Sequence, residues 1–201
     1  GPNGAGKTTM LRMLSTLARP TSGTIRVMGI DAKEDPDKVR DHIGLISHNS
    51  MLYPDLTAME NMMFVARLYG VVDPEARVRE LLRAVELDHR RFDSVRTFSR
   101  GMTQRLSIAR ALINDPDVVF LDEPYAGLDP HAVEIFDELI ASLREGRTFV
   151  MVSHELQKGF AACTHAMMLA RGRVMVCSPK DELDFDEFKG LYRETVGMGV
   201  A

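Results

Sequence analysis

The chain has 201 residues, 45% of them hydrophobic and 27% charged, and this composition predicts one soluble globular domain with a substantial core. The net charge of −4 argues against a broad basic surface, so we expect no nucleic-acid partner. The longest apolar runs have five residues, far fewer than a membrane-spanning helix requires.

The chain opens on a phosphate-binding loop. The pattern GxxxxGK[ST] is met by Gly1, Gly6, Lys7 and Thr8, and such loops surround a phosphate with backbone amides and a helix N-terminus. We expect Lys7 to reach the β- and γ-phosphates of ATP and the Thr8 hydroxyl to bind Mg²⁺. The alternative is a chance glycine-rich loop. The expected ATP-binding residues of this segment are Gly1, Pro2, Asn3, Gly4, Ala5, Gly6, Lys7, Thr8 and Thr9.

A helix with an apolar stripe is expected after the loop, and this stripe predicts packing on a sheet. Its apolar residues are Met10, Leu11, Leu14 and Leu17. A phosphate-binding loop ordinarily follows a buried strand, whereas this sequence begins at Gly1 without such a strand and without Met. We therefore expect that the natural domain extends upstream and that the chain is unstable or inert without that part.

A helical segment interrupts an alternation of strands and helices. Thr57 and Glu60 have the spacing of a capping box at a helix start, and Asp73-Pro74 marks the start of a second helix. We expect an α-helical insert at 49–108 within an α/β core formed by 1–48 and 109–178, with a C-terminal tail at 179–201. The other expected elements are strands at 24–27, 43–47, 118–121 and 148–152, and helices at 104–113 and 131–143.

Polar side chains stand at the ends of two of these strands, where parallel strands form a ligand-binding crevice. Asp122 and Glu123 end the strand at 118–121, and His154 follows the strand at 148–152. We expect Asp122 to hold Mg²⁺, usually through a water, and Glu123 to orient and deprotonate an attacking water. His154 is expected to donate to the γ-phosphate and to hold Glu123 in line. The alternatives are a pair of helix-capping acids and a structural histidine.

A hairpin is expected at the sheet edge, with strands at 166–170 and 173–176. The two cysteines of the chain, Cys163 and Cys177, have no His or Cys neighbours at ligand spacing. This pattern predicts two buried free thiols and argues against a disulfide or a zinc site.

The segment 98–105, Phe-Ser-Arg-Gly-Met-Thr-Gln-Arg, resembles the LSGGQ signature of ABC-type ATPases. The other motifs of that family follow in its order and spacing. They are the phosphate-binding loop at 1–8, the signature at 98–102, the Walker B strand with the catalytic glutamate at 118–123, the D-loop at 126–129 and the switch histidine His154. The resemblance covers nearly the whole chain. It implies a single domain at 1–201 with a P-loop NTPase fold, a RecA-like, mostly parallel sheet and an inserted α-helical subdomain.

The resemblance also implies a homodimer in which two copies close head to tail on two ATP molecules. Ser99 and Gly101 of one copy would then contact the γ-phosphate held by Lys7 of the other, and Asp129 of the D-loop is expected at the same ATP. The family's usual Gly and Gln are replaced by Arg100 and Met102. Because Ser99 and Gly101 are retained, we expect an active site.

His48 occupies the position of a family glutamine that touches Mg²⁺ and senses the transmembrane partner. Histidine is a poor ligand for Mg²⁺, although it can donate to a phosphate or a water, so we expect His48 near the ATP in an altered role. Together with the Leu-Tyr-Pro-Asp-Leu-Thr-Ala stretch at 52–58, this histidine resembles haem exporters of cytochrome c biogenesis and their ABC-2-type relatives.

The resemblance implies an ATP-hydrolysing subunit that powers a separate membrane permease. The favoured transport activity is haem export for cytochrome c biogenesis. Such a subunit is cytoplasmic and peripheral on the inner face of the plasma membrane, and the Met-rich segment 51–69 would dock the permease. The alternatives are an ABC-2-type multidrug or sodium exporter, a non-transport ABC ATPase of DNA repair or translation, and a regulatory domain that binds ATP without hydrolysing it.

Overall fold

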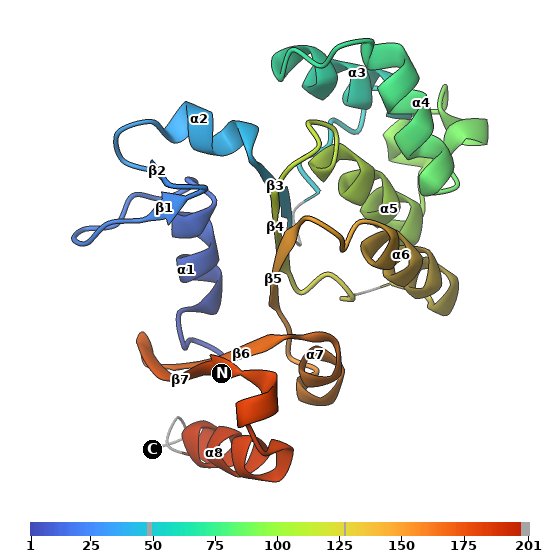
Figure 1. The fold of residues 1–201 in the computed structure, drawn as a ribbon. Coiled ribbons are helices and arrows are strands. Elements are labelled where there is room, and N and C mark those ends of the chain that lie inside the picture. Colours follow the sequence, from blue (N-terminus) through green and yellow to red (C-terminus); the bar gives the residue numbers. More distant parts are fainter. Residues whose placement is uncertain (48–49, 127, 198–201) are drawn as a thin grey trace.

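A three-stranded parallel sheet lies at the centre of the computed structural model, which describes residues 1–47, 50–126 and 128–197 (Figure 1). Its strands are β3 (Ile43–Ile46), β4 (Val118–Asp122) and β5 (Thr148–Val152), in the order β3-β4-β5. The predicted strand at 148–152 is confirmed, and the strand predicted at 43–47 ends one residue earlier.

The middle strand, β4, is buried along its whole length. Successive side chains of a strand point to opposite faces of the sheet. Accordingly, Val119 and Leu121 belong to the core on one face, whereas Val118 and Phe120 belong to the core on the other. Both faces are therefore covered, which explains why this strand reads as an uninterrupted apolar run.

One face of the sheet is covered by α1 (Lys7–Leu14), α2 (Pro36–Asp41) and the hairpin of β1 (Arg26–Val27) and β2 (Ile30–Asp31). The hairpin has a two-residue turn, Met28-Gly29, with φ of 51° and 80°, and this tight turn leaves less strand than the predicted 24–27. The expected packing of Leu17 is wrong, because α1 ends at Leu14 and the Leu17 side chain is exposed.

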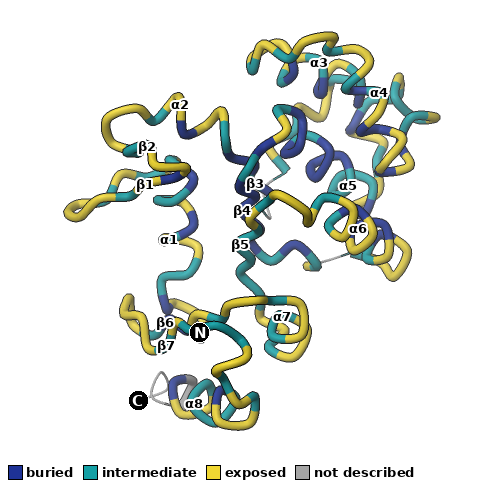
Figure 2. Tube along the Cα trace, viewed as in Figure 1, coloured by how far each residue is buried: buried dark blue, intermediate teal, exposed yellow. Residues whose placement is uncertain are grey.

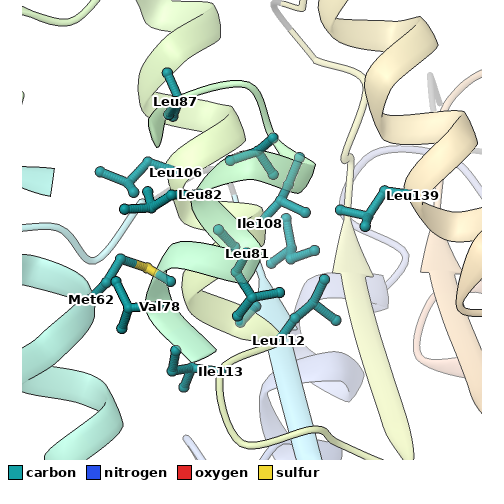
Figure 3. Packing of buried hydrophobic residues seen from close by; sticks show 14 of the residues in the cluster. Met62, Val78, Leu81, Leu82, Leu87, Leu106, Ile108, Leu112, Ile113 and Leu139 are labelled. Carbon is teal, nitrogen blue, oxygen red and sulfur yellow. The ribbon is translucent and has the colours of Figure 1, made fainter. Parts of the chain in front are cut away.

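Helices α5 (Arg100–Ala111) and α6 (Pro130–Ser142) cover the other face, and α3 (Ala58–Leu68) and α4 (Pro74–Ala84) pack against α5 on the side away from the sheet (Figure 1). Figure 3 shows side chains of α3, α4 and α5 meeting in one cluster that reaches Leu139 of α6. The capping box is confirmed: the Glu60 amide donates to Thr57 Oγ1 at 3.1 Å, and the Thr57 amide donates to Glu60 Oε2 at 2.8 Å.

Helix α5 joins the predicted helical insert to the sheet. It begins about one turn before the predicted position 104, because Ser99 caps it, and it runs past residue 108, where the insert was expected to end. Near its C-terminus the helix passes so close to β3 that a Cβ on Gly44 would lie 2.3 Å from the Ala111 carbonyl oxygen. Figure 2 shows that the buried residues of β3, β4 and α5 lie side by side.

The C-terminal part forms the predicted antiparallel hairpin and two further helices, but the hairpin is a two-stranded sheet of its own and does not extend the edge of the parallel sheet. The hairpin consists of β6 (His165–Ala170) and β7 (Arg173–Pro179), and the helices are α7 (Leu156–Ala162) and α8 (Phe185–Gly197). Short 3₁₀ turns span Asp88–Arg90, Val95–Thr97 and Lys180–Glu182. Both cysteines are free, but Cys177 is exposed and Cys163 is only partly buried, so the prediction of buried thiols is wrong. Within the described residues, no helix has the length and apolar character needed to cross a bilayer.

Candidate active site

A pocket of about 230 Å³ lies between the loop that precedes α1 and the carboxyl ends of β4 and β5. Every residue that lines it was predicted as a site residue, although the loop and the catalytic pair lie more than 100 residues apart in the sequence. The lining residues are Asn3, Gly4, Ala5, Gly6, Lys7, Thr8, Thr9, Glu123 and His154. The structure therefore brings the expected phosphate-binding loop and the expected catalytic pair to one place.

The loop has the backbone geometry of an anion site. Gly4 and Gly6 have φ of 74° and 99°, a left-handed conformation that glycine adopts at little cost. Gly6 is the N-cap of α1 and has no side chain to bond the first amides of that helix, so in the described structure no side chain caps α1. Amides of a helix N-terminus that lack such a cap bind anions readily.

The β6–β7 hairpin supports this loop from behind. The Gly172 amide in the hairpin turn donates to the Ala5 carbonyl at 3.0 Å. A Cβ on Gly1 would lie 1.9 Å from the Leu169 carbonyl oxygen, so position 1 has no room for a side chain. The loop is thus held between the hairpin and α1, with its open side toward the pocket.

Lys7 crosses the loop with its side chain. The Nζ group donates to the carbonyls of Gly1 at 2.7 Å and Pro2 at 2.9 Å. Burial lowers the pKa of Lys7, and the nearby carboxylates of Glu123 and Asp122 act in the opposite direction. The ammonium group therefore stands in a partly dehydrated site, where its attraction for a phosphate is stronger than at the surface.

Two oxygen donors of the kind that Mg²⁺ prefers meet beside the lysine. The Thr8 hydroxyl donates to Asp122 Oδ1 at 3.3 Å, and Asp122 is buried at the end of β4. A hard cation with several waters or phosphate oxygens needs only one or two such protein ligands. The pair fits Mg²⁺ bound together with a phosphate, although the described residues contain no cluster of three His, Cys, Asp or Glu side chains that could hold a metal alone.

Glu123 and His154 lie in direct contact. The backbone amide of His154 donates to Glu123 Oε2 at 3.1 Å, and the His154 Nε2 atom is 3.1 Å from Glu123 Oε1. Glu123 has φ of 53°, a left-handed conformation that costs a non-glycine residue free energy. The contacts with His154 thus fix the carboxylate at the pocket wall, where Glu123 is only 23% exposed.

The signature residues Ser99 and Gly101 do not line this pocket, and Gly101 lies against Asp129 of the D-loop. Ser99 caps α5 by accepting from the Met102 amide at 3.2 Å. Gly101 is buried, and a Cβ there would lie 3.0 Å from Asp129 Oδ2. Asp129 in turn caps α6, since its Oδ1 accepts from the Ala132 amide at 2.8 Å. His48 and Gly127 lie outside the described residues.

One buried polar residue that orders the loop before α3 was missed by the sequence analysis. Asn61 is buried on the inner face of α3. Its Nδ2 donates to the carbonyls of Tyr53 at 3.0 Å and Thr57 at 2.9 Å, and its Oδ1 accepts from the Tyr53 amide at 2.8 Å. The available signal was a polar residue beside Ala58 and Met62 on the apolar face of the predicted helix. Such a residue usually bonds the backbone of a neighbouring loop.

A phosphate-binding loop, a parallel sheet covered on both faces and acids at the strand ends define the P-loop NTPase class. The family comparison is more specific: a family model described as ABC transporter matches residues 1–126. The chain belongs to the ABC transporter family and is an ATPase domain of that family.

Curated relatives agree with this assignment. The chain is 41% identical over 179 residues to the ABC transporter ATP-binding protein NatA of Bacillus subtilis, covering 87% of this chain and 73% of that protein. It is 38% identical over 186 residues to the Nod factor export ATP-binding protein I of Cupriavidus metallidurans, covering 91% of this chain and 61% of the relative. Part of each relative's length thus lies outside the match.

Solved structures confirm the predicted α/β fold. An ATP-binding subunit of an ABC transporter superposes with a TM-score of 0.85 at 29% identity, covering 97% of this chain and 85% of the other. A dimeric ATP-binding cassette in a post-hydrolysis state, bound to ADP and Pi, superposes with a TM-score of 0.80 at 30% identity, covering 90% and 83%. The P-loop NTPase fold with a parallel sheet is therefore established for this chain.

Proposed function

We propose that this chain binds and hydrolyses ATP in the pocket formed by Lys7, Thr8, Glu123 and His154, and that the whole protein uses this hydrolysis to drive a separate membrane permease. The observation that carries the proposal is the meeting of a phosphate-binding loop with a buried acid pair and a histidine. ATP-binding proteins among the relatives support the same activity.

Binding is assigned to the residues around the loop. The amides of residues 3–9 and the Lys7 ammonium would surround the β- and γ-phosphates, in exchange for the carbonyls that Lys7 now contacts. Thr8 and Asp122 would hold Mg²⁺, Asp122 usually through a water. The ion, when bound, would offset the negative charge of the phosphates.

Hydrolysis is assigned to Glu123 and His154. Glu123 would orient a water and accept its proton while the water oxygen bonds to the γ-phosphorus and the bond to the β-phosphate oxygen breaks, giving ADP and phosphate. The His154 amide holds Glu123 Oε2, so Oε1 is the oxygen that remains for the water. The His154 imidazole, beside that oxygen, would donate to the γ-phosphate.

Two copies of the chain are proposed to complete the site. Ser99 and Gly101 do not line the pocket of their own chain, which is expected if they serve the ATP of a second copy. A similar cassette has been solved as a dimer. The permease is proposed to dock beside α3, where Tyr53, Phe64 and Leu68 are exposed, and docking would hold the protein at the inner face of the membrane.

The relatives favour an ABC-2-type exporter as the class of transporter that this chain serves. Besides NatA and the Nod factor export protein, the chain is 36% identical to the linearmycin resistance ATP-binding protein LnrL of Bacillus subtilis, over 186 residues that cover 91% of this chain and 60% of LnrL. None of these three names refers to haem. Haem export for cytochrome c biogenesis therefore stays a prediction from the sequence around His48, without support from these relatives.

ATP turnover by the full-length protein with its permease tests the proposal. Glu123→Gln keeps the shape of the side chain and removes its basicity, so we expect turnover to fall by about 100-fold or more while ATP still binds. Glu138→Gln, on the exposed face of α6, is the matched control and should leave turnover unchanged. Equal turnover of the wild type and Glu123→Gln would contradict the assignment.

A further inference from the structure

The carboxylate of Glu86 lies between three helices. Glu86 follows Val85, the C-cap of α4. Its Oε2 is 2.9 Å from Nε2 of His131 in the first turn of α6 and 3.7 Å from Nη1 of Arg105 in α5. Arg105 Nη1 also donates to the Val85 carbonyl at 3.0 Å. The segment directly after α4 therefore contacts both α5 and α6 through polar groups.

The backbone at this position makes a side chain costly. Glu86 has φ of 56°, a left-handed conformation that glycine adopts freely and that is strained for other residues. The contacts of the carboxylate offer a reason for a glutamate here. The Glu86 side chain is 55% exposed and Arg105 already bonds the Val85 carbonyl, so this carboxylate connects the helices through weak, exposed contacts.

The two helices that Glu86 connects are α5, which carries the signature, and α6, which follows the D-loop. Gly101, in the first turn of α5, lies against the carboxylate of Asp129, the N-cap of α6. Arg105, about one turn further along α5, reaches His131 through Glu86. These two polar contacts add to the apolar packing of α5 against α6 and further restrict the relative orientation of the two helices.

We propose that Glu86 is a positioning residue, which holds α5 and α6 as one unit so that Ser99 and Asp129 of one copy meet the ATP of the other copy together. This inference rests on the proposed function. Because Lys7 binds ATP within its own chain, losing the connection should affect the closed dimer and spare the first ATP-binding step.

The test is ATP turnover of the full-length protein with its permease, comparing wild type, Glu86→Gly and His131→Leu, with unfolding midpoints measured in parallel. Glu86→Gly should lower kcat about threefold to fivefold, the effect of losing an exposed ion pair, with an unchanged KM for ATP. Its unfolding midpoint should be unchanged or higher, because glycine relieves the left-handed strain. His131→Leu should lower kcat similarly, whereas His131→Lys keeps a hydrogen-bond donor for Glu86 and should retain most of the wild-type kcat.

Met28→Gly is the matched control, since Met28 also has a left-handed φ of 51° and lies in the β1–β2 turn. It should gain stability with wild-type kcat. A wild-type kcat in Glu86→Gly, or a loss of kcat that accompanies a lowered unfolding midpoint, would overturn the positioning role. A wild type without ATP turnover would instead refute the proposed function.

Discussion

Glu123 is held in the pocket by its neighbour rather than by its own backbone preference. Its left-handed φ of 53° turns the chain directly after buried β4, and the Glu123 amide still donates to the Val152 carbonyl at 3.0 Å. Strain of this kind persists only where the surroundings fix it. Here the neighbouring strand and the His154 amide do so, and they aim the carboxylate at the loop that carries Lys7.

Lys7 should dominate ATP affinity. Lys7→Ala removes the charged donor that now bonds the carbonyls of Gly1 and Pro2, and we expect the Kd for ATP to rise about 10- to 100-fold, the cost of losing a hydrogen bond to a charged group. Calorimetric titration of the full-length protein measures this directly. Lys33→Ala, at an exposed position, is the control, and equal affinity of the two variants would contradict the role of Lys7.

At the residue scale, the sequence predicted the contacts that recur in a motif. The Thr8–Asp122 pair, which spans 114 positions, followed from the motif order. The Glu86–His131 pair did not, because exposed charges have many possible partners and only the packing of α4, α5 and α6 selects one. The missed Asn61 shows the same limit, since its partners lie in an irregular loop.

At the scale of elements, the fit between β3 and α5 depends on Gly44. A Cβ there would lie 2.3 Å from the Ala111 carbonyl oxygen and 3.1 Å from Pro116, so the helix end or the strand would have to move. Because β3 leads toward position 48, which is expected near the ATP, and α5 begins at the signature, this contact connects two parts of the proposed site.

Gly44→Ala should therefore destabilise the protein by about 1–3 kcal/mol, the usual cost of overpacking a core. Gly190→Ala is the matched control, because Gly190 lies in α8 with no atom within 4 Å of the added Cβ, and it should stabilise the helix by up to about 1 kcal/mol. Urea unfolding of the full-length protein measures both changes. If the two variants have the same midpoint, the close packing of β3 and α5 is refuted.

Elements with a clear hydrophobic period or a helix-capping residue were predictable from the sequence, whereas element ends that are set by a turn were not. The strand at 148–152 and the helix capped by Thr57 lie where the sequence placed them. The end of α1 at Leu14 was missed because the apolar spacing continues to Leu17, past the point where the backbone leaves the helix. The Met28-Gly29 turn was also missed. Within the segment expected as a C-terminal tail, residues 185–197 form α8, and Phe185 and Phe188 of this helix pack on Phe160.

At the scale of the whole molecule, the site divides into two faces. The phosphate-binding loop, Asp122, Glu123 and His154 form one face, and Ser99, Gly101 and Asp129 form another that the pocket of the same chain does not include. We infer that a second copy joins the two. The family assignment and a dimeric relative with ADP and Pi support this arrangement.

The mass of the full-length Glu123→Gln protein in solution tests this central claim most directly. The variant should keep ATP bound without hydrolysing it, so light scattering with Mg-ATP should give twice the monomer mass, and with Mg-ADP the monomer mass. The same monomer mass with both nucleotides, under conditions where ATP binding is confirmed, would contradict an ATP site shared by two copies.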